Sequence, residues 1–196
     1  MKVVIIKYNA GNIRSVLFAL ERIGVNAIVT DDYDEIRSAD KVIFPGVGEA
    51  SSAMKYLKEK GLDKLICSLT QPVLGICLGM QLMCAHSEEN DTECLGIFTE
   101  TVKRFPEAGY KIPQIGWNNI SNLKTYLFDN VPDNVYMYFV HGYYVEACSD
   151  AISTTNYIEE YSSALHKDNF YAVQFHPEKS GEFGQKILEN FIKGKL

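Results

Sequence analysis

Short apolar runs alternate with amphipathic stretches over the first half of the chain. The apolar runs predict buried strands at residues 3–6, 27–29, 41–44 and 73–76. The stretches between them repeat apolar residues at helical spacing and predict helices at residues 12–23, 51–60, 62–69 and 78–85. Strands that alternate with helices in this way predict a parallel sheet that is covered on both faces.

The second half of the chain is richer in β-branched and aromatic residues. These runs predict strands that extend the sheet in antiparallel fashion, at residues 101–105, 118–121, 135–140, 151–157, 163–166 and 171–175. A closing helix is predicted at residues 184–192. Together the two halves predict one three-layer α/β/α domain over residues 1–196 with a mixed central sheet.

Composition and charge narrow the classes of function. The chain has 196 residues, about the length of one domain, and its 46% hydrophobic content argues against disorder. Nineteen basic and 25 acidic residues give a net charge of −6, which disfavours binding to nucleic acid or to anionic membranes. No apolar run approaches the ~18–20 residues that cross a bilayer, and the first apolar run is too short for a signal peptide. A cytoplasmic location is therefore expected.

Cysteine usage fits a reducing compartment. The chain has five cysteines, an odd number, and no two of them form a C-x-x-C pair. Neither a disulfide framework nor a zinc ribbon is therefore predicted. The sequence also predicts no metal site and no organic cofactor.

The strongest local signal is VLGICLGMQ at residues 73–81, where G-x-C-x-G joins a predicted strand to a predicted helix. This is the thiol version of a nucleophile elbow, a tight turn that exposes the nucleophile. Gly75 and Gly79 remove side chains that would clash where the helix starts beside the strand. The helix N-terminus after Cys77 favours a thiolate and offers backbone N–H groups to an oxyanion. The alternative is a small buried cysteine in an ordinary turn.

A cysteine nucleophile needs a base, and His176 is the best of the four histidines. It directly follows a predicted strand, and Pro177 ends that strand. Glu178 stands two residues further on, so its carboxylate can accept the Nδ1 proton and leave Nε2 facing a thiol. The alternative is a strand-ending turn with a surface carboxylate. His86 and His166 are expected at the surface.

A glycine-rich loop, PGVG at residues 45–48, shares its first two glycines with a dinucleotide-binding fingerprint. The match is weak, because Ser51 occupies the third glycine position and the loop follows the third strand rather than the first. A flexible loop whose backbone N–H turns toward a developing oxyanion is the better interpretation.

Three motifs together, GICLGMQ, PGVG and FHPE, resemble the class I (triad) glutamine amidotransferases, which have a flavodoxin-like α/β/α fold. Further segments resemble the glutaminase subunits of imidazole glycerol phosphate synthases: YNAGNIRS at 8–15, GWN at 116–118, YFVHGYY at 138–144 and HPEKSG at 176–181. The matching segments extend over nearly the whole chain.

The resemblance implies a Cys-His-Glu triad acting on L-glutamine. Cys77 would attack the side-chain amide, His176 would carry the proton to the leaving ammonia, and Glu178 would orient His176. The oxyanion would be held by backbone N–H groups, those of Leu78 and of Gly46 or Val47.

The resemblance also implies where the amino-acid end of glutamine binds. Gln81 and Glu89 match positions that hold this end, and the backbone of Gly142 and Tyr143 matches the segment that meets its carboxylate. Family members often have a small hydroxyl residue where Gly142 stands, so a side-chain contact there is not expected.

The resemblance also implies a partner subunit. In the family, ammonia travels through a channel to a (β/α)₈-barrel cyclase subunit in a heterodimer of the histidine pathway. Positions at or near that interface are matched by Asn12, Trp117, Tyr138 and Lys179. Structural alternatives are a helix N-cap for Asn12, core positions for Trp117 and Tyr138, and an ordinary surface lysine. A loop that withholds one oxyanion donor until the partner binds would leave the free subunit a poor glutaminase.

Two other interpretations stay open. One is a paralogous amidotransferase that supplies ammonia to a different synthase, for example in surface-sugar biosynthesis. The other is a thiol hydrolase or protease on the same scaffold, which would not need Gln81, Glu89 or the aromatic segment at 138–144 as a glutamine site.

Overall fold

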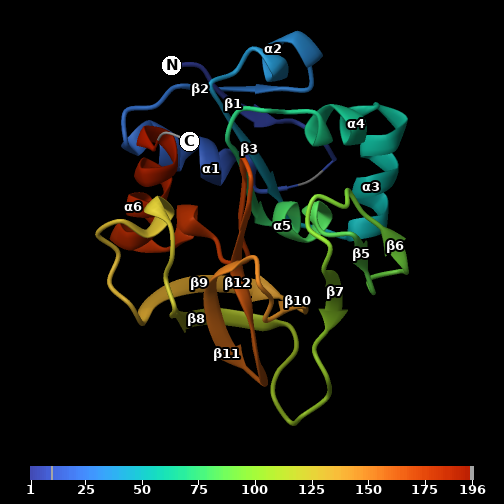
Figure 1. The fold of residues 1–196 in the computed structure, drawn as a ribbon, viewed down its shortest axis with the longest axis vertical. Helices are drawn as coiled ribbons and strands as arrows, with labels where there is room; N and C mark the ends of the chain where they lie inside the picture. Colours follow the sequence, from blue (N-terminus) through green and yellow to red (C-terminus); the bar gives the residue numbers. More distant parts are fainter. Residues whose placement is uncertain (10, 195–196) are drawn as a thin grey trace.

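A computed structural model describes residues 1–9 and 11–194, so Ala10 of the 8–15 segment lies outside the described residues. Five parallel strands form the centre of the molecule (Figure 1). In spatial order they are β2 (Ala27–Thr30), β1 (Val3–Ile6), β3 (Lys41–Gly46), β4 (Val73–Cys77) and β13 (Phe170–Val173). The predicted parallel sheet is confirmed. The prediction of an antiparallel strand at 171–175 is right for one neighbour only, because β13 pairs antiparallel with the next strand of the sheet but parallel with β4.

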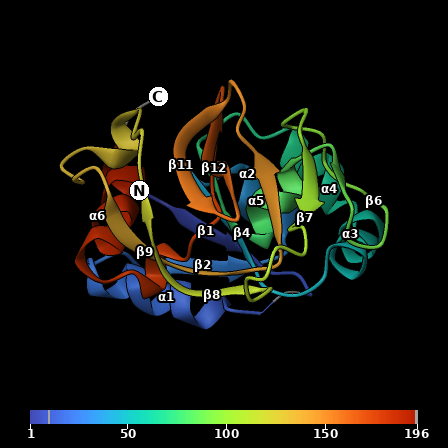
Figure 2. The same ribbon diagram turned by 90° about the horizontal axis from the view of Figure 1, so that it is seen from below.

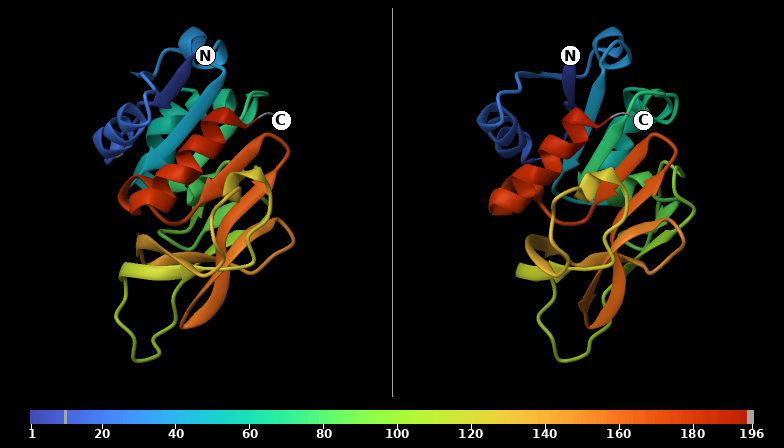
Figure 3. Two further views of the ribbon diagram at one scale, coloured as in Figure 1. Left: turned by 90° about the vertical axis from the view of Figure 1, so that its left-hand side faces the viewer. Right: turned by 60° about the vertical axis from the view of Figure 1, so that its left-hand side comes forward.

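Helices cover both faces of this sheet (Figure 3). One face carries α1 (Ile13–Arg22) and α6 (Gly181–Lys193), and the other carries α3 (Ala50–Glu59), α4 (Leu62–Cys67) and α5 (Leu78–Met83). Residues along β1 alternate between two separate hydrophobic cores, as the period of a strand requires: Val4 and Ile6 face one core, Val3 and Ile5 the other. The three-layer prediction is confirmed.

A short helix, α2 (Tyr33–Arg37), was not predicted from the pattern. Its five residues are too few to show a helical repeat. Asp32 nevertheless marks its start, because its side chain accepts a hydrogen bond of 2.9 Å from the N–H of Glu35.

Antiparallel strands extend the sheet beyond β13, which confirms a mixed sheet. β12 (Glu159–Lys167) pairs with β13, and β11 (Ala151–Tyr157) pairs with β12. The sheet continues through β10 (Tyr143–Glu146), β7 (Thr101–Arg104), β5 (His86–Ser87) and β6 (Thr92–Glu93), where only the pairing of β5 with β7 is parallel.

Two predicted strands do not join this sheet. β8 (Gln114–Ile120) and β9 (Val135–His141) form a separate two-stranded sheet, so their prediction as strands of the main sheet is wrong. One isolated antiparallel bridge, between Ser121 and Thr154, links the end of the predicted 118–121 strand to β11. This β8–β9 ribbon lies across the carboxyl end of the parallel strands (Figures 1 and 2). Two single 3₁₀ turns, η1 (Tyr126–Phe128) and η2 (Pro177–Lys179), complete the structure.

The strand order β2-β1-β3-β4-β13 is that of flavodoxin-like folds, in which ligands bind beyond the carboxyl ends of the strands near the switch point between β1 and β3. Asn12 and His176 follow β1 and β13, the PGVG loop begins in the last residues of β3, and Cys77 is the last residue of β4. The topology therefore collects them at one edge. No described helix has both the length and the apolar character needed to cross a membrane.

Candidate active site

Cys77 lies at the junction of β4 and α5 in a strained conformation, with φ 54° and ψ −108°. Such a backbone is rare for a residue with a side chain and is found mainly at functional sites. Glycines make the turn possible. A Cβ on Gly79 would lie 1.9 Å from the carbonyl oxygen of Phe44, and one on Gly75 would lie 2.9 Å from Sδ of Met83. The predicted elbow geometry is present.

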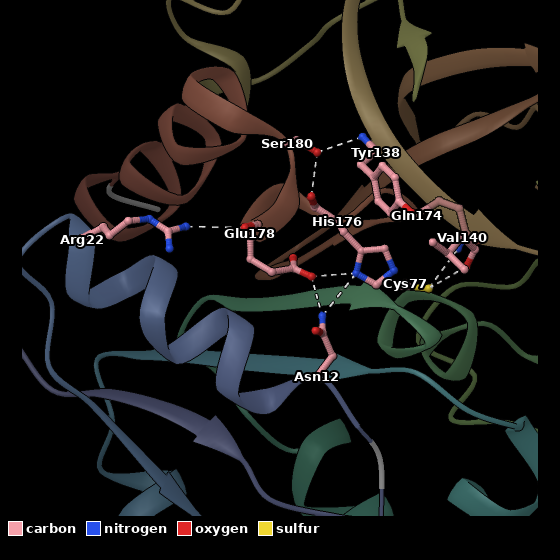
Figure 4. A network of polar contacts seen from close by, with 9 residues as sticks. All are labelled: Asn12, Arg22, Cys77, Tyr138, Val140, Gln174, His176, Glu178 and Ser180. Atoms are coloured by element: carbon pink, nitrogen blue, oxygen red, sulfur yellow. Dashed lines mark hydrogen bonds and ion pairs between the residues drawn. The ribbon is translucent and has the colours of Figure 1, made fainter. Parts of the chain in front are cut away.

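Glu178, His176 and Cys77 lie in a row, with the imidazole between the carboxylate and the thiol (Figure 4). The distance between Nδ1 of His176 and Oε1 of Glu178 is 2.7 Å, and both side chains are fully buried. Figure 4 shows the other edge of the imidazole turned toward Cys77. Its Nε2 is buried and has no hydrogen-bond partner among the described residues. The carboxylate therefore fixes the ring so that its unused nitrogen faces the sulfur.

Electrostatics favour a charged imidazole. Burial lowers the pKa of His176, but interactions with Cys77 and Glu178 outweigh burial and raise the pKa to about 10. An imidazolium beside a thiol is the partner that stabilises a thiolate, the nucleophilic form of cysteine.

Asn12 takes part in this arrangement. Its side-chain amide donates a hydrogen bond to Oε1 of Glu178 and lies 3.4 Å from Nδ1 of His176. Asn12 occupies the N-cap position of α1, as the structural alternative predicts, but its side chain makes no capping hydrogen bond and contacts Glu178 instead. The sequence did not reveal the contact with Glu178, since 166 positions separate the two residues.

The backbone of β9 contacts both sides of the site. The carbonyl of Tyr138 accepts a hydrogen bond of 2.9 Å from the N–H of His176, and the N–H of Tyr138 donates to Oγ of Ser180 at 2.9 Å. Two residues further along, the carbonyl oxygen of Val140 lies 3.7 Å from Sγ of Cys77. A small movement of β9 would therefore displace groups in contact with both the nucleophile and the base.

A pocket of about 600 Å³ opens beside Cys77. Seven of the residues singled out from the sequence line it: Val47, Cys77, Leu78, Gln81, Glu89, Gly142 and Tyr143. Arg104, which the sequence analysis did not single out, lines the same pocket and is exposed. Gly46 is buried at the end of β3 beside the pocket, where it is paired in register with Cys77.

A buried amide links the nucleophile to the pocket wall. Nε2 of Gln174 lies 3.7 Å from Sγ of Cys77, and its Oε1 accepts a hydrogen bond of 3.0 Å from Gln81. Gln81 also donates to the carbonyl of Tyr143 at 3.1 Å. Sequence analysis missed Gln174 because a single glutamine carries no motif. The available signal was a polar residue inside the apolar run FYAVQF.

His141 is held neutral and serves the pocket wall. Burial lowers its pKa to about 4. Its Nδ1–H donates to the carbonyl of Tyr143 at 2.7 Å, and its Nε2 lies 3.2 Å from the hydroxyl of Tyr161. These contacts fix the Gly142–Tyr143 segment, and they leave His176 as the histidine that faces the thiol.

Glu89 is half-buried and lines the same pocket. Its Oε2 accepts a hydrogen bond of 2.8 Å from the N–H of Ala50, the first residue of α3, and burial raises its pKa. The other carboxylate oxygen makes no such capping bond. Glu89 thus lines the pocket from a fixed position.

The remaining predicted positions lie on the outer surface. Trp117 is 55% exposed, so the alternative of a core position for it is wrong. It packs edge-on against half-buried Tyr138, with 5.9 Å between ring centroids. Ile115 and Tyr136 are also exposed on the β8–β9 ribbon, and exposed Lys179 belongs to η2 beside it. Among residues 1–9 and 11–194 no cluster of three or more His, Cys, Asp or Glu side chains could hold a metal ion.

Comparisons with known proteins agree with this geometry. The family model for class-I glutamine amidotransferases matches residues 4–194. The imidazole glycerol phosphate synthase subunit HisH of Bacteroides fragilis (strain YCH46) is 57% identical over 98% of this chain and 100% of its own length. HisH of Haemophilus influenzae (strain Rd) is 45% identical over 98% of both chains. A solved glutamine amidotransferase aligns over 98% of both chains with a TM-score of 0.76 at 15% identity, which supports the fold alone. The chain therefore belongs to the class I glutamine amidotransferases and, within them, to the HisH subunits of imidazole glycerol phosphate synthase.

Proposed function

We propose that this subunit hydrolyses L-glutamine to glutamate and ammonia and passes the ammonia to its partner in histidine biosynthesis, in the cytoplasm. The observation that carries the proposal is the convergence of Cys77, His176 and Glu178 beside an open pocket. The names of the curated relatives favour this pathway over a different synthase.

Covalent catalysis divides a difficult amide hydrolysis into two easier steps. The thiolate of Cys77 attacks the side-chain amide carbon of glutamine and forms a tetrahedral intermediate. His176 then gives its proton to the amide nitrogen, ammonia leaves, and a thioester remains. In the second half His176 takes a proton from water, which attacks the thioester and releases glutamate. Glu178 keeps the imidazole oriented through both halves.

The oxyanion of each tetrahedral intermediate needs hydrogen-bond donors. The N–H of Leu78, directly after the nucleophile, is the first proposed donor. The second comes from the PGVG loop, through the N–H of Gly46 or Val47. Loss of one such donor typically lowers the rate by about 10²–10³.

The amino-acid end of glutamine is recognised by charge. The carboxylate of Glu89 faces the ammonium group, while the Gly142–Tyr143 backbone and the cationic Arg104 serve the α-carboxylate. Gln81 is held by Gln174 and Tyr143 in a position to meet the substrate.

The partner docks on the β8–β9 ribbon and the adjoining surface of Asn12 and Lys179. Exposed aromatic residues such as Trp117 and Tyr136 are unusual on a surface that stays in water and are enriched at interfaces. By resemblance the partner is a (β/α)₈-barrel cyclase. Docking there acts on the strand that contacts both Cys77 and His176.

The test uses the Cys77→Ser variant in complex with the partner subunit. Synthesis should stop with glutamine as nitrogen source and continue with added ammonia. Cys67→Ser is the matched control, because Cys67 is an exposed cysteine that does not line the pocket, and it should keep both activities. Loss of the ammonia-dependent reaction in Cys77→Ser would contradict a separate ammonia-producing site.

A further inference from the structure

Tyr8 carries a buried hydroxyl that the mechanism above does not use. It follows β1, its side chain is only 5% exposed, and its ring packs on Phe44 with 5.0 Å between centroids. The hydroxyl has no hydrogen-bond partner among residues 1–9 and 11–194. Because burial raises the pKa of this phenol, it stays protonated and remains a donor. Buried donors are nearly always satisfied, so an unsatisfied one asks for a functional explanation.

The hydroxyl lies against the proposed oxyanion loop. A Cβ on Gly46 would be 2.1 Å from the Tyr8 oxygen and 3.2 Å from Cβ of Leu78. Gly46 is also the residue that pairs in register with Cys77. The phenol, the loop and the residue after the nucleophile therefore meet at one point.

The peptide bond between Gly46 and Val47 presents a donor on one side and an acceptor on the other. In a planar trans peptide the N–H of Val47 and the carbonyl of Gly46 point in opposite directions. Val47 lines the pocket and Tyr8 does not. When the N–H of Val47 turns toward the pocket, the Gly46 carbonyl turns away from it, and the Tyr8 hydroxyl, which lies against Gly46 outside the pocket lining, is the neighbouring donor.

We propose that Tyr8 is a positioning residue, whose hydroxyl donates a hydrogen bond to the Gly46 carbonyl and so holds the N–H of Val47 toward the oxyanion. The inference rests on the proposed function and adds a residue to its regulation. The neighbouring backbone already ties the two segments together, since the N–H of Gly11 donates to the carbonyl of Val47 at 3.3 Å. Tyr8 supplies the contact that depends on which way the loop peptide faces.

The test is Tyr8→Phe, which keeps the ring and removes only the hydroxyl, measured in the complex with the partner subunit. The kcat for glutamine should fall about tenfold, the effect of one lost hydrogen bond, with KM unchanged. The aldehyde analogue of glutamine, which forms a tetrahedral adduct with Cys77, should lose affinity by the same factor. Alkylation of Cys77 by iodoacetamide should keep its rate, because the nucleophile is untouched.

Tyr126→Phe is the matched control. Its hydroxyl is also buried without a partner in the described chain, and Tyr126 belongs to η1, which packs on α6, while its ring contacts Tyr171 of β13. This variant should keep the wild-type kcat and analogue affinity. A second check is Gly46→Ala, whose added methyl group meets the Tyr8 hydroxyl: Tyr8→Phe should partly restore the melting temperature of Gly46→Ala, and Tyr126→Phe should not.

Unchanged kcat and analogue affinity in Tyr8→Phe would overturn the inference. So would parallel losses of kcat and of the alkylation rate, which would indicate a general structural role. Neither result touches the proposed function, which fails only if the wild-type complex does not use glutamine.

Discussion

Replacing Gly79 by alanine tests how the elbow holds the nucleophile. The new Cβ would stand 1.9 Å from the backbone oxygen of Phe44, where real contacts of this kind are not closer than 3.0 Å. A backbone oxygen in a central strand cannot move aside, so α5 must shift by at least about 1 Å. The shift carries Leu78 and Cys77 with it, because they form the start of the same turn.

Two effects should follow. Overpacking of this kind typically costs about 1–3 kcal/mol of unfolding free energy, which for a chain of this size lowers the melting temperature by roughly 2–12 °C. A displacement of about 1 Å at a reacting group can lower the rate by about 10²-fold, so kcat for glutamine should fall by that order.

The measurements are thermal unfolding of the free subunit and glutamine turnover in the complex. Gly142→Ala is the control for stability, because its Cβ would meet only Ile112 and Pro113 at 3.7 and 3.8 Å, ordinary contact distances. A folded Gly79→Ala protein with the wild-type melting temperature and kcat would refute close packing of α5 on β3 as the constraint on Cys77.

Three further predictions concern the base, its orientation and the partner. Cys77→Ala should lower the pKa of His176 from about 10, measured by NMR titration, because it removes one of the two groups that raise it. Because folding raises the pKa of His176, this histidine stabilises the folded state fully below about pH 6.5, and the stabilisation is lost as the pH rises toward 10. Between these two pH values, the free energy of unfolding of the wild type should therefore fall more steeply with pH than that of Cys77→Ala. Asn12→Ala removes a donor to the carboxylate of Glu178, and steady-state kinetics should show kcat lowered about tenfold or more at similar KM; full kcat would exclude the contact from the mechanism. Trp117→Ala should raise the Kd of the complex by about tenfold or more in calorimetry and leave the melting temperature of the free subunit unchanged, since the side chain is 55% exposed; equal affinity would place the interface elsewhere.

The parts of the site that were predictable depend on residues that are close together in the sequence. G-x-C-x-G fixes its own turn, because Gly75 and Gly79 are needed within two residues of Cys77. Likewise His176 and Glu178 are two residues apart, so their hydrogen bond follows from the local turn.

Contacts between distant segments were not predictable in this way. Asn12 reaches Glu178, and Tyr8 reaches Gly46, only because β1, β3 and β13 end at the same edge of the sheet. Gln174 gains its role by facing Cys77 from just beyond the end of β13, the strand beside β4.

The direction of a strand and the sheet to which it belongs were also not predictable from the sequence. Apolar alternation has the same appearance in a parallel and an antiparallel strand, so the parallel pairing of β13 with β4 was missed. The strands of the β8–β9 ribbon alternate apolar and polar residues as strands of the main sheet do, so the pattern did not show that they form a separate ribbon. No helix covers the outer face of this ribbon among the described residues, and Trp117 and Tyr136 are exposed there.

The double contact of β9 with Cys77 and His176 bears on inhibition. A compound seated on the aromatic outer face of the ribbon, the proposed partner surface, would block assembly and disturb the nucleophile from outside the pocket proposed for glutamine. Such an inhibitor would be non-competitive, so a cell could not escape it by accumulating substrate.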